Sequence, residues 1–347
     1  MPYFLWRLYK NFEGEILAIP GKTVAFFGIL FLFCLYFIPI HPYVLRILTF
    51  SAIFAIYAAS WDLLYFAGQL NLGHGAFFGV AGYVAAILDL QLHLPSGVAI
   101  ILGAIGGVIC GLILGIPALR MRGPYLAILT LAFPVILSGI VFAFSDITGG
   151  ELGLSGISSL SESDLSVYYI CLVVMLLSVL IMWKLADTRS SIVRTGIVFK
   201  AVAEDEIAAR TSGINTPRYK LLAFAVSAFF AGISGGLYVY VIKVAGPSTF
   251  HPLFSIHPVI WTIFGGAGSI YGPVAGVFIL YPFWGGLFAA TPELRMIIFN
   301  ALIIIIILFM PEGISHWFRD RTERMCPRCK LINSRRRSSC RACSAAL

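Results

Sequence analysis

Residues 97–119 read GVAIILGAIGGVICGLILGIPAL, a run of 23 residues without a single charge. About 20 apolar residues suffice for an α-helix to cross a hydrocarbon core of roughly 30 Å, so this stretch predicts a transmembrane helix. Comparable runs lie on both sides of it, at 23–40, 43–66, 70–90, 124–144, 166–186, 219–243 and 294–310, and a less regular apolar region covers 255–284. The pattern indicates an all-α polytopic membrane protein, a bundle of about 8–10 transmembrane helices.

The composition excludes an ordinary soluble protein. Hydrophobic residues make up 59% of the chain and charged residues 12%, against about 45–50% and about 25% in soluble domains. The sequence contains no phosphate-binding loop motif, so we expect no nucleotide hydrolysis by this chain itself. We expect three regions: a cytoplasmic N-terminal segment at 1–22 that is not a cleaved signal peptide, a membrane domain at 23–313, and a cytoplasmic basic tail at 314–347.

The charges between the apolar runs predict the orientation of the chain. Basic residues gather near Arg120, between 184 and 220, and after Pro311, whereas the loop 145–165 carries four acids and no lysine or arginine. Because basic loops remain in the cytoplasm, we expect both termini inside and loop 145–165 outside. This loop includes Gly149 and Gly150, which could meet a binding protein or a solute, although solvated loop residues are the simpler interpretation.

The parity of this topology requires the region 255–284 to enter and leave the membrane on its outer face. The sequence FGGAGSIYGP, Phe264–Pro273, interrupts the region with Gly265, Gly266 and Gly268. Glycine and proline free backbone groups, which membranes tolerate only inside protein or beside a cavity. We therefore expect two short helices around a re-entrant break, a feature that often marks a transport pathway.

A second glycine-rich stretch, GQLNLGHGAFFGVAGY, covers Gly68–Tyr83 and carries polar residues at membrane depth. Small residues at such spacing let helices pack closely, while intramembrane polar groups usually face the interior of the bundle. Packing is the favoured interpretation for the glycines. Lining a pathway and satisfying structural hydrogen bonds remain equal alternatives for the polar side chains. The candidate residues are Gln69, Asn71, Gly73, His74 and Gly75.

The cytoplasmic segment at about 196–218 combines early acids with later small residues. Acids near the start and bases near the end favour a short helix that stops at a glycine. Such a helix is either a solvated loop helix or an amphipathic element that presses into a groove of a cytoplasmic partner. The candidate coupling residues are Glu204, Asp205, Glu206, Ala208, Ala209 and Gly213.

Five blocks in this order, AGQLNLGHGAFFGVAGY, RMRGPYLAILTLAF, TGGELGLSGI, AEDEIAARTSGINTPRYKLLAF and FGGAGSIYGPVAG, resemble the LivM branch of branched-chain amino acid ABC transporter permeases over roughly residues 45–313. The resemblance implies a non-enzymatic permease subunit that needs no cofactor for transport. It implies a LivH-like permease partner, two cytoplasmic ATPase subunits and an extracytoplasmic solute-binding protein. It also implies that Glu206, Ala208, Ala209 and Gly213 form the coupling motif that docks on the ATPase.

The tail extends beyond the region of resemblance and carries four cysteines in two close pairs: Cys326, Cys329, Cys340 and Cys343. Four thiolates at this spacing can surround a zinc ion tetrahedrally, as in compact zinc ribbons. A disulfide pair is the alternative, which a reducing cytoplasm disfavours. The arginines between the pairs, Arg335, Arg336 and Arg337, are suited to anionic membrane lipid or to an acidic partner, and we expect no nucleic-acid partner.

Two other functions compete with amino-acid import. A urea or short-amide importer would share the same permease architecture, and the sequence separates the two only weakly. A secondary transporter driven by an ion gradient belongs to a different class and requires ionisable groups inside the membrane. The best candidates for such groups are Asp62 and His74, and the coupling segment would have no purpose in that mechanism.

Overall fold

The computed structural model describes residues 41–121, 123–187 and 194–283, and beyond them the positions 301, 304, 308, 313–314, 323–327, 332–334, 339–340 and 343. Its helices are α3 (Pro42–Phe66), α4 (Gly75–Leu92), α5 (Ser96–Ala118), α6 (Pro124–Ala143), α7 (Ser145–Thr148), α8 (Asp164–Ala186), α9 (Thr195–Glu204), α10 (Glu206–Thr211), α11 (Thr216–Ile242), the 3₁₀ helix η3 (Pro247–Phe250), α12 (Pro252–Gly265) and α13 (Tyr271–Pro282). Strand β1 (Leu154–Ser155) pairs antiparallel with β2 (Val244–Ala245), and β3 (Glu323–Met325) with β4 (Ile332–Ser334).

Six of the described helices, α3, α4, α5, α6, α8 and α11, are long and apolar enough to cross a membrane. They correspond to the six predicted runs between residues 43 and 243, so the multi-pass helical fold is confirmed. The predicted runs 23–40 and 294–310 lie outside the described residues, apart from isolated positions. Proline stands in the first turn of α3, α6, α11 and α12, where its missing N–H costs nothing and its fixed φ suits the helix start.

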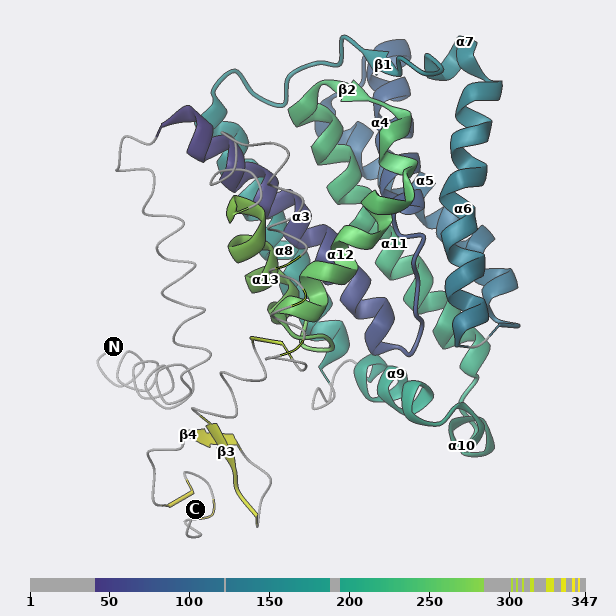
Figure 1. Ribbon diagram of the computed structural model, residues 1–347, viewed down its shortest axis with the longest axis vertical. Helices are drawn as coiled ribbons and strands as arrows, with labels where there is room; N and C mark the ends of the chain where they lie inside the picture. Colours follow the sequence, from purple (N-terminus) through teal and green to yellow (C-terminus); the bar gives the residue numbers. More distant parts are fainter. Residues whose placement is uncertain are drawn as a thin grey trace, which may run out of the picture.

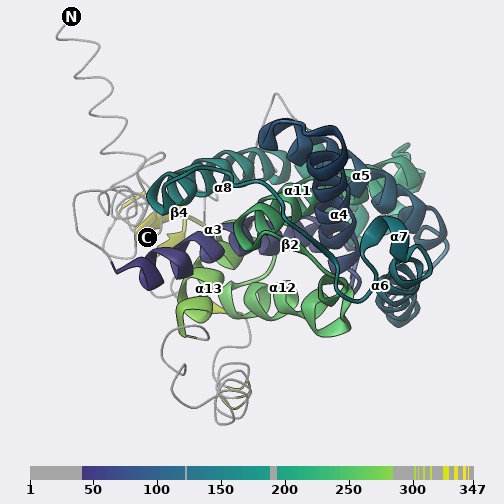
Figure 2. The same ribbon diagram turned by 90° about the horizontal axis from the view of Figure 1, so that it is seen from above.

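Helices α4, α5 and α11 form a tightly packed group, with α3 against α11 and α8 against α3 (Figure 1, Figure 2). Glycines four residues apart on α5 allow the close approach. A Cβ on Gly103 would lie 2.5 Å from the Ala81 carbonyl oxygen, and one on Gly111 would lie 2.6 Å from the Ala228 Cβ. In a membrane, where hydrophobic burial does not hold helices together, such backbone contact is a main source of helix association.

The described part of the bundle has two distinct ends. The β1–β2 pair and α7 lie at one end, which we call the outer end, and α9 and α10 lie at the opposite, inner end (Figure 1). The acidic loop and the candidate coupling segment are therefore on opposite sides of the bundle. This is the separation that the distribution of charges predicts.

The region 244–283 forms the predicted pair of short helices. After β2 at the outer end, η3 lies beside α4, α12 descends along α3, and α13 turns back along α3 as well (Figure 1). The chain breaks between them at Gly266, Gly268 and Ile270, all with positive φ. One expected boundary was wrong. The run 70–90 is helical only from Gly75, because residues 67–74 form an irregular segment whose polar groups are satisfied by neighbouring side chains.

Candidate functional site

The irregular segment before α4 is held by a buried hydrogen-bond network. The Trp61 indole N–H donates to the Asn71 carbonyl oxygen at 2.5 Å, and the Asn71 Oδ1 accepts from the Gly73 N–H at 2.8 Å. The two nitrogens of His74 lie 2.8 Å from the Ser60 hydroxyl and 3.3 Å from the Asn71 Nδ2. Each of these side chains has a partner inside the protein, so the network can fix the segment against α3 without any solute.

The glycines of this segment lie at tight contacts. A Cβ on Gly73 would collide with the Thr130 backbone, and one on Gly75 would lie 2.6 Å from the Ser255 Oγ. Gln69 is buried beside them. In contrast, Gly149 and Gly150 lie at the end of α7, at the outer end, with φ values of +74° and +58° that favour glycine. The structure therefore separates the outer-loop glycines from the other candidate residues.

A buried carboxylate clamps the break between α12 and α13. Asp62, in the last turns of α3, is fully buried and accepts from the Gly268 N–H at 2.5 Å and from the Ile270 N–H at 2.7 Å. Ile270 is held at φ +57°, where a branched residue is strained. Next to the break, a Cβ on Gly265 would strike the Gly272 carbonyl. The clamp lies toward the inner end, since Gly68, just after α3, contacts Ala203 of α9.

A cavity of about 410 Å³ opens between α3, α11, α12 and α13. Its wall includes Arg46, Phe50 and Phe54 of α3 and Phe254, His257 and Trp261 of α12. Tyr238 of α11 and Tyr281 of α13 add two phenol rings. None of these residues was a sequence-based candidate. The available signal was the spacing of 46, 50 and 54 on one face of a single helix.

The coupling segment forms two short helices instead of one. Asp205, in an extended conformation, separates α9 from α10 and caps α10 by accepting from the Ile207 and Ala208 N–H groups at 2.8 and 3.0 Å. At the other end, the Ile214 N–H donates to the Ala209 carbonyl and the Gly213 N–H to the Arg210 carbonyl, both at 3.1 Å. This pattern with a left-handed glycine is a Schellman motif. The predicted helix end at Gly213 is confirmed.

The three consecutive acids have three different environments. Glu204 makes an exposed pair with Lys200 at 3.8 Å, and Asp205 is the cap described above. Glu206 points inward, with its carboxylate 2.7 Å from the Lys220 Nζ and 3.0 Å from the Arg210 guanidinium. Ala209 is buried, while Ala208 and Ile207 are exposed. Glu206 therefore anchors α10 to α11, and α10 exposes the apolar Ile207 and Ala208 near its start, ahead of the polar Arg210 and Thr211.

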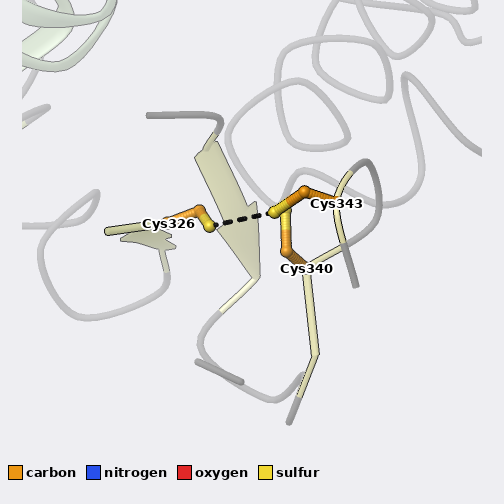
Figure 3. A group of neighbouring side chains, drawn as sticks. All are labelled: Cys326, Cys340 and Cys343. Atoms are coloured by element: carbon orange, nitrogen blue, oxygen red, sulfur yellow. Dashed lines mark hydrogen bonds between the residues drawn. The ribbon is translucent and has the colours of Figure 1, made fainter. Parts of the chain in front are cut away.

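Three of the four tail cysteines come together (Figure 3). The thiol sulfurs of Cys326, Cys340 and Cys343 all lie within 4.8 Å of one another, and those of Cys326 and Cys343 are 3.5 Å apart. Cys326 follows directly after strand β3, between the two paired strands. Cys329 lies outside the described residues. Three thiols at this separation can act as ligands of one metal ion.

The fold and these sites define an integral membrane protein with a solute-sized aromatic cavity and an anchored helix pair at its inner end. Residues 43–307 match the family of permease components of branched-chain amino acid transport systems. The chain therefore belongs to this family of permease components, and this membership supports a transport role and not an enzymatic one.

Proteins similar to this chain have different solutes in their names. The chain is 28% identical to the LivM permease protein of the high-affinity branched-chain amino acid transport system of Salmonella typhimurium, over 88% of this chain and 79% of the relative. It is also 28% identical to Escherichia coli LivM, over 74% and 66% of the two chains. The fructose import permease protein FrcC of Rhizobium meliloti is 25% identical, over 77% and 76%. Family membership alone therefore does not determine the solute.

Proposed function

We propose that this chain is the membrane-spanning subunit of an ATP-binding cassette importer that carries branched-chain amino acids into the cell. The observation that carries the proposal is the match to the permease family over residues 43–307, together with similarity to two LivM proteins over most of the chain. The outer end then faces the solute-binding protein. The inner end faces the cytoplasm with both termini, and residues 23–313 form the permease domain.

The coupling segment supports an ATP-driven mechanism. Helix α10 is fixed to α11 by the buried Lys220–Glu206 pair and exposes Ile207, which is 65% accessible. A rigidly anchored helix with an apolar tip is suited to insertion into a groove on an ATPase subunit. We propose that two such ATPases drive this chain and a LivH-like permease between outward-facing and inward-facing states.

The buried ionisable groups of the described residues give an ion-driven mechanism little support. Asp62 is bonded to two backbone N–H groups, and Asp89 accepts from Ser158 and Tyr240. Lys220 is paired with Glu206. In the described conformation both carboxylates accept hydrogen bonds from protein groups, so no bound ion is needed to account for their burial.

The test of this function is uptake by vesicles that contain the complete importer. The chain would be reconstituted with a LivH-like permease, two ATPase subunits and a solute-binding protein from the same source organism. We expect uptake of radiolabelled L-leucine that requires ATP inside the vesicle and is not displaced by D-ribose or urea. ATP-dependent uptake of urea or ribose in place of leucine would assign the solute to another class. Leucine uptake without ATP, driven by an ion gradient, would refute the importer.

We also propose that the tail at 314–347 binds one zinc ion through Cys326, Cys329, Cys340 and Cys343. The clustering of three of these thiols supports the proposal. A short basic segment needs a metal to hold its fold, because it buries little apolar surface. Metal analysis of the purified full chain under reducing conditions should give one zinc per chain, lost in the double variant Cys340→Ser/Cys343→Ser. An unchanged zinc content in that variant would refute the site.

A further inference from the structure

The cavity between α3 and α12 differs in composition from the surfaces that face lipid. The outward surfaces of α5 and α6 expose mainly aliphatic side chains, among them Ile105, Ile113, Ile128 and Ile136, with Tyr125 and Phe142 as the aromatic exceptions. The cavity wall is aromatic instead, and Phe50, Phe54 and Trp261 are each at most 9% exposed. Tyr238, Tyr281 and His257 add polar groups to the wall. Acyl chains of lipids cannot form hydrogen bonds with such groups. Small-molecule sites, in contrast, combine apolar and aromatic walls with a few polar side chains.

Arg46 supplies the positive charge of this cavity. Its guanidinium carbon lies 5.9 Å from the centre of the Phe50 ring, within range of a cation–π contact. The ion pairs found among the described residues, Lys184–Asp187, Lys200–Glu204 and the two pairs of Glu206, all belong to the inner end. No acidic side chain lines the described cavity wall. The guanidinium can therefore receive an anion from solution, and its planar fork matches a carboxylate.

The depth of the cavity suits a small zwitterion with an apolar side chain. Residues 46, 50 and 54 lie on one face of α3. The axial distance from residue 46 to residue 54 is about 12 Å at 1.5 Å per residue. Its volume of about 410 Å³ lies near the lower end of the usual range for small-molecule sites, roughly 300–1,000 Å³. Aromatic faces can attract an ammonium group beside the guanidinium. Phe54 and Trp261, whose rings are 5.2 Å apart, offer an apolar surface further in.

We infer that this cavity is a solute-binding site of the permease itself, in which Arg46 holds the α-carboxylate of an amino acid and the aromatic wall holds its side chain. The inference deepens the proposed function and rests on it, because it assumes that the solute is an amino acid. It adds a specificity determinant within the permease. A sugar or urea has no carboxylate for Arg46, so the site selects against solutes of those classes.

The test is direct binding to the full chain in lipid nanodiscs without the solute-binding protein. Displacement of radiolabelled L-leucine by L-leucine, L-leucinamide and D-ribose would be compared. Leucinamide replaces the carboxylate by a neutral amide of nearly the same shape. Loss of a charge-assisted, two-pronged interaction should weaken binding by about 10- to 100-fold. We therefore expect leucinamide to bind the wild-type chain about 10- to 100-fold more weakly than leucine, and we expect ribose not to displace leucine.

Variants supply the second half of the test. Arg46→Gln should weaken leucine binding by about 10- to 100-fold and bring leucine and leucinamide to equal affinity, while Arg46→Lys should retain part of the preference. The matched control is Arg120→Gln, which changes an exposed arginine just after the end of α5 and should bind like wild type. The comparison of ligands on the wild-type chain needs no variant and so does not depend on the folding of Arg46→Gln.

Several results would overturn the inference. These are equal affinity for leucine and leucinamide on the wild-type chain, displacement of leucine by ribose, or no saturable leucine binding in the millimolar range. If the complete importer still takes up leucine with ATP in such a case, the proposed function stands and only the cavity assignment fails. If the complete importer carries ribose or urea and not leucine, the proposed function itself fails.

Discussion

The clamp between Asp62 and the α12–α13 break offers the sharpest test of the structure. Replacing Asp62 by asparagine keeps the size of the side chain but changes one carboxylate oxygen into an amide NH₂ group. The amide oxygen can still accept from one N–H, of Gly268 or Ile270, but the other N–H then faces a second donor. One buried backbone N–H is therefore left without an acceptor.

The size of the effect on the break follows from the free-energy cost of this unsatisfied N–H group. An unsatisfied buried polar group costs about 1–3 kcal/mol, partly offset because a neutral amide is cheaper to bury than a carboxylate. The lower cost of burying an amide changes the free energy of unfolding of the whole chain. The loss of one hydrogen-bond acceptor destabilises the closed conformation of the break. At about 1.4 kcal/mol per factor of ten, conformations in which the break has moved away from α3 should become on the order of ten- to 100-fold more populated.

Cysteine labelling at the break measures this population. Ala267, next to Gly268, is partly buried and would be replaced by cysteine in a chain whose seven native cysteines are replaced by alanine. The rate of maleimide labelling reports how often the site opens when opening and closing are fast. We expect Asp62→Asn to raise this rate on the order of tenfold or more.

The matched control is Asp89→Asn, which perturbs another buried carboxylate, toward the outer end of α4. That carboxylate accepts from the Ser158 N–H at 2.8 Å and from the Tyr240 hydroxyl at 3.2 Å. We expect Asp89→Asn to leave the labelling of residue 267 near its original rate. An unchanged rate in Asp62→Asn would refute the clamp, and an equal increase in both variants would indicate a general loosening of the bundle.

Two further predictions test other parts of the molecule. Gly75→Leu should abolish leucine uptake by the complete importer while the chain still co-purifies with its ATPases, because even a Cβ there meets Ser255. Gly139→Leu, where a Cβ meets nothing within 4 Å, should transport normally, and equal uptake by both variants would contradict the packing argument. Glu206→Lys should reduce both uptake and co-purification with the ATPase, because it places a third cation beside Lys220 and Arg210. Normal values in both assays would show that α10 needs no anchor.

Much of the fold could be predicted because its signals are local. An uncharged run such as 97–119 has few alternatives to a transmembrane helix, and Gly213 marks a helix end through its own backbone preference. The expected single coupling helix was less accurate. Asp205 can either continue a helix or cap a new one, and its sequence neighbours do not decide between them. The inward direction of Glu206 depends on Lys220, one helix further along the chain.

The cavity and the clamp could not be predicted for a related reason. Aromatic residues such as Phe54 and Trp261 are common in helix cores, and only the fold brings α3 and α12 together around an empty volume. Asp62 and Gly268 are 206 positions apart in sequence. An isolated acid near the end of an apolar run is equally compatible with an ion site, a membrane boundary or a cap, and tertiary contact alone separates these.

The positions of the cavity and the clamp along α3 suggest how import would proceed. The cavity is lined by the stretch of α3 from Arg46 to Phe54, and the clamp at Asp62 lies about two helical turns beyond Phe54, toward the inner end. We expect the break to lie on the path of the solute from the cavity to the inner end, and the clamp then opposes movement of the break by a few kcal/mol. A two-state element needs about 5.5 kcal/mol of differential binding to move from 1:99 to 99:1. An ATPase partner could supply this free energy if it binds α10 with different affinity in its ATP-bound and nucleotide-free states. The difference would reach α3 through α11, which contacts both α10 and α3. We therefore expect weakening of the clamp to raise leak of leucine in the absence of ATP, and not merely to slow uptake.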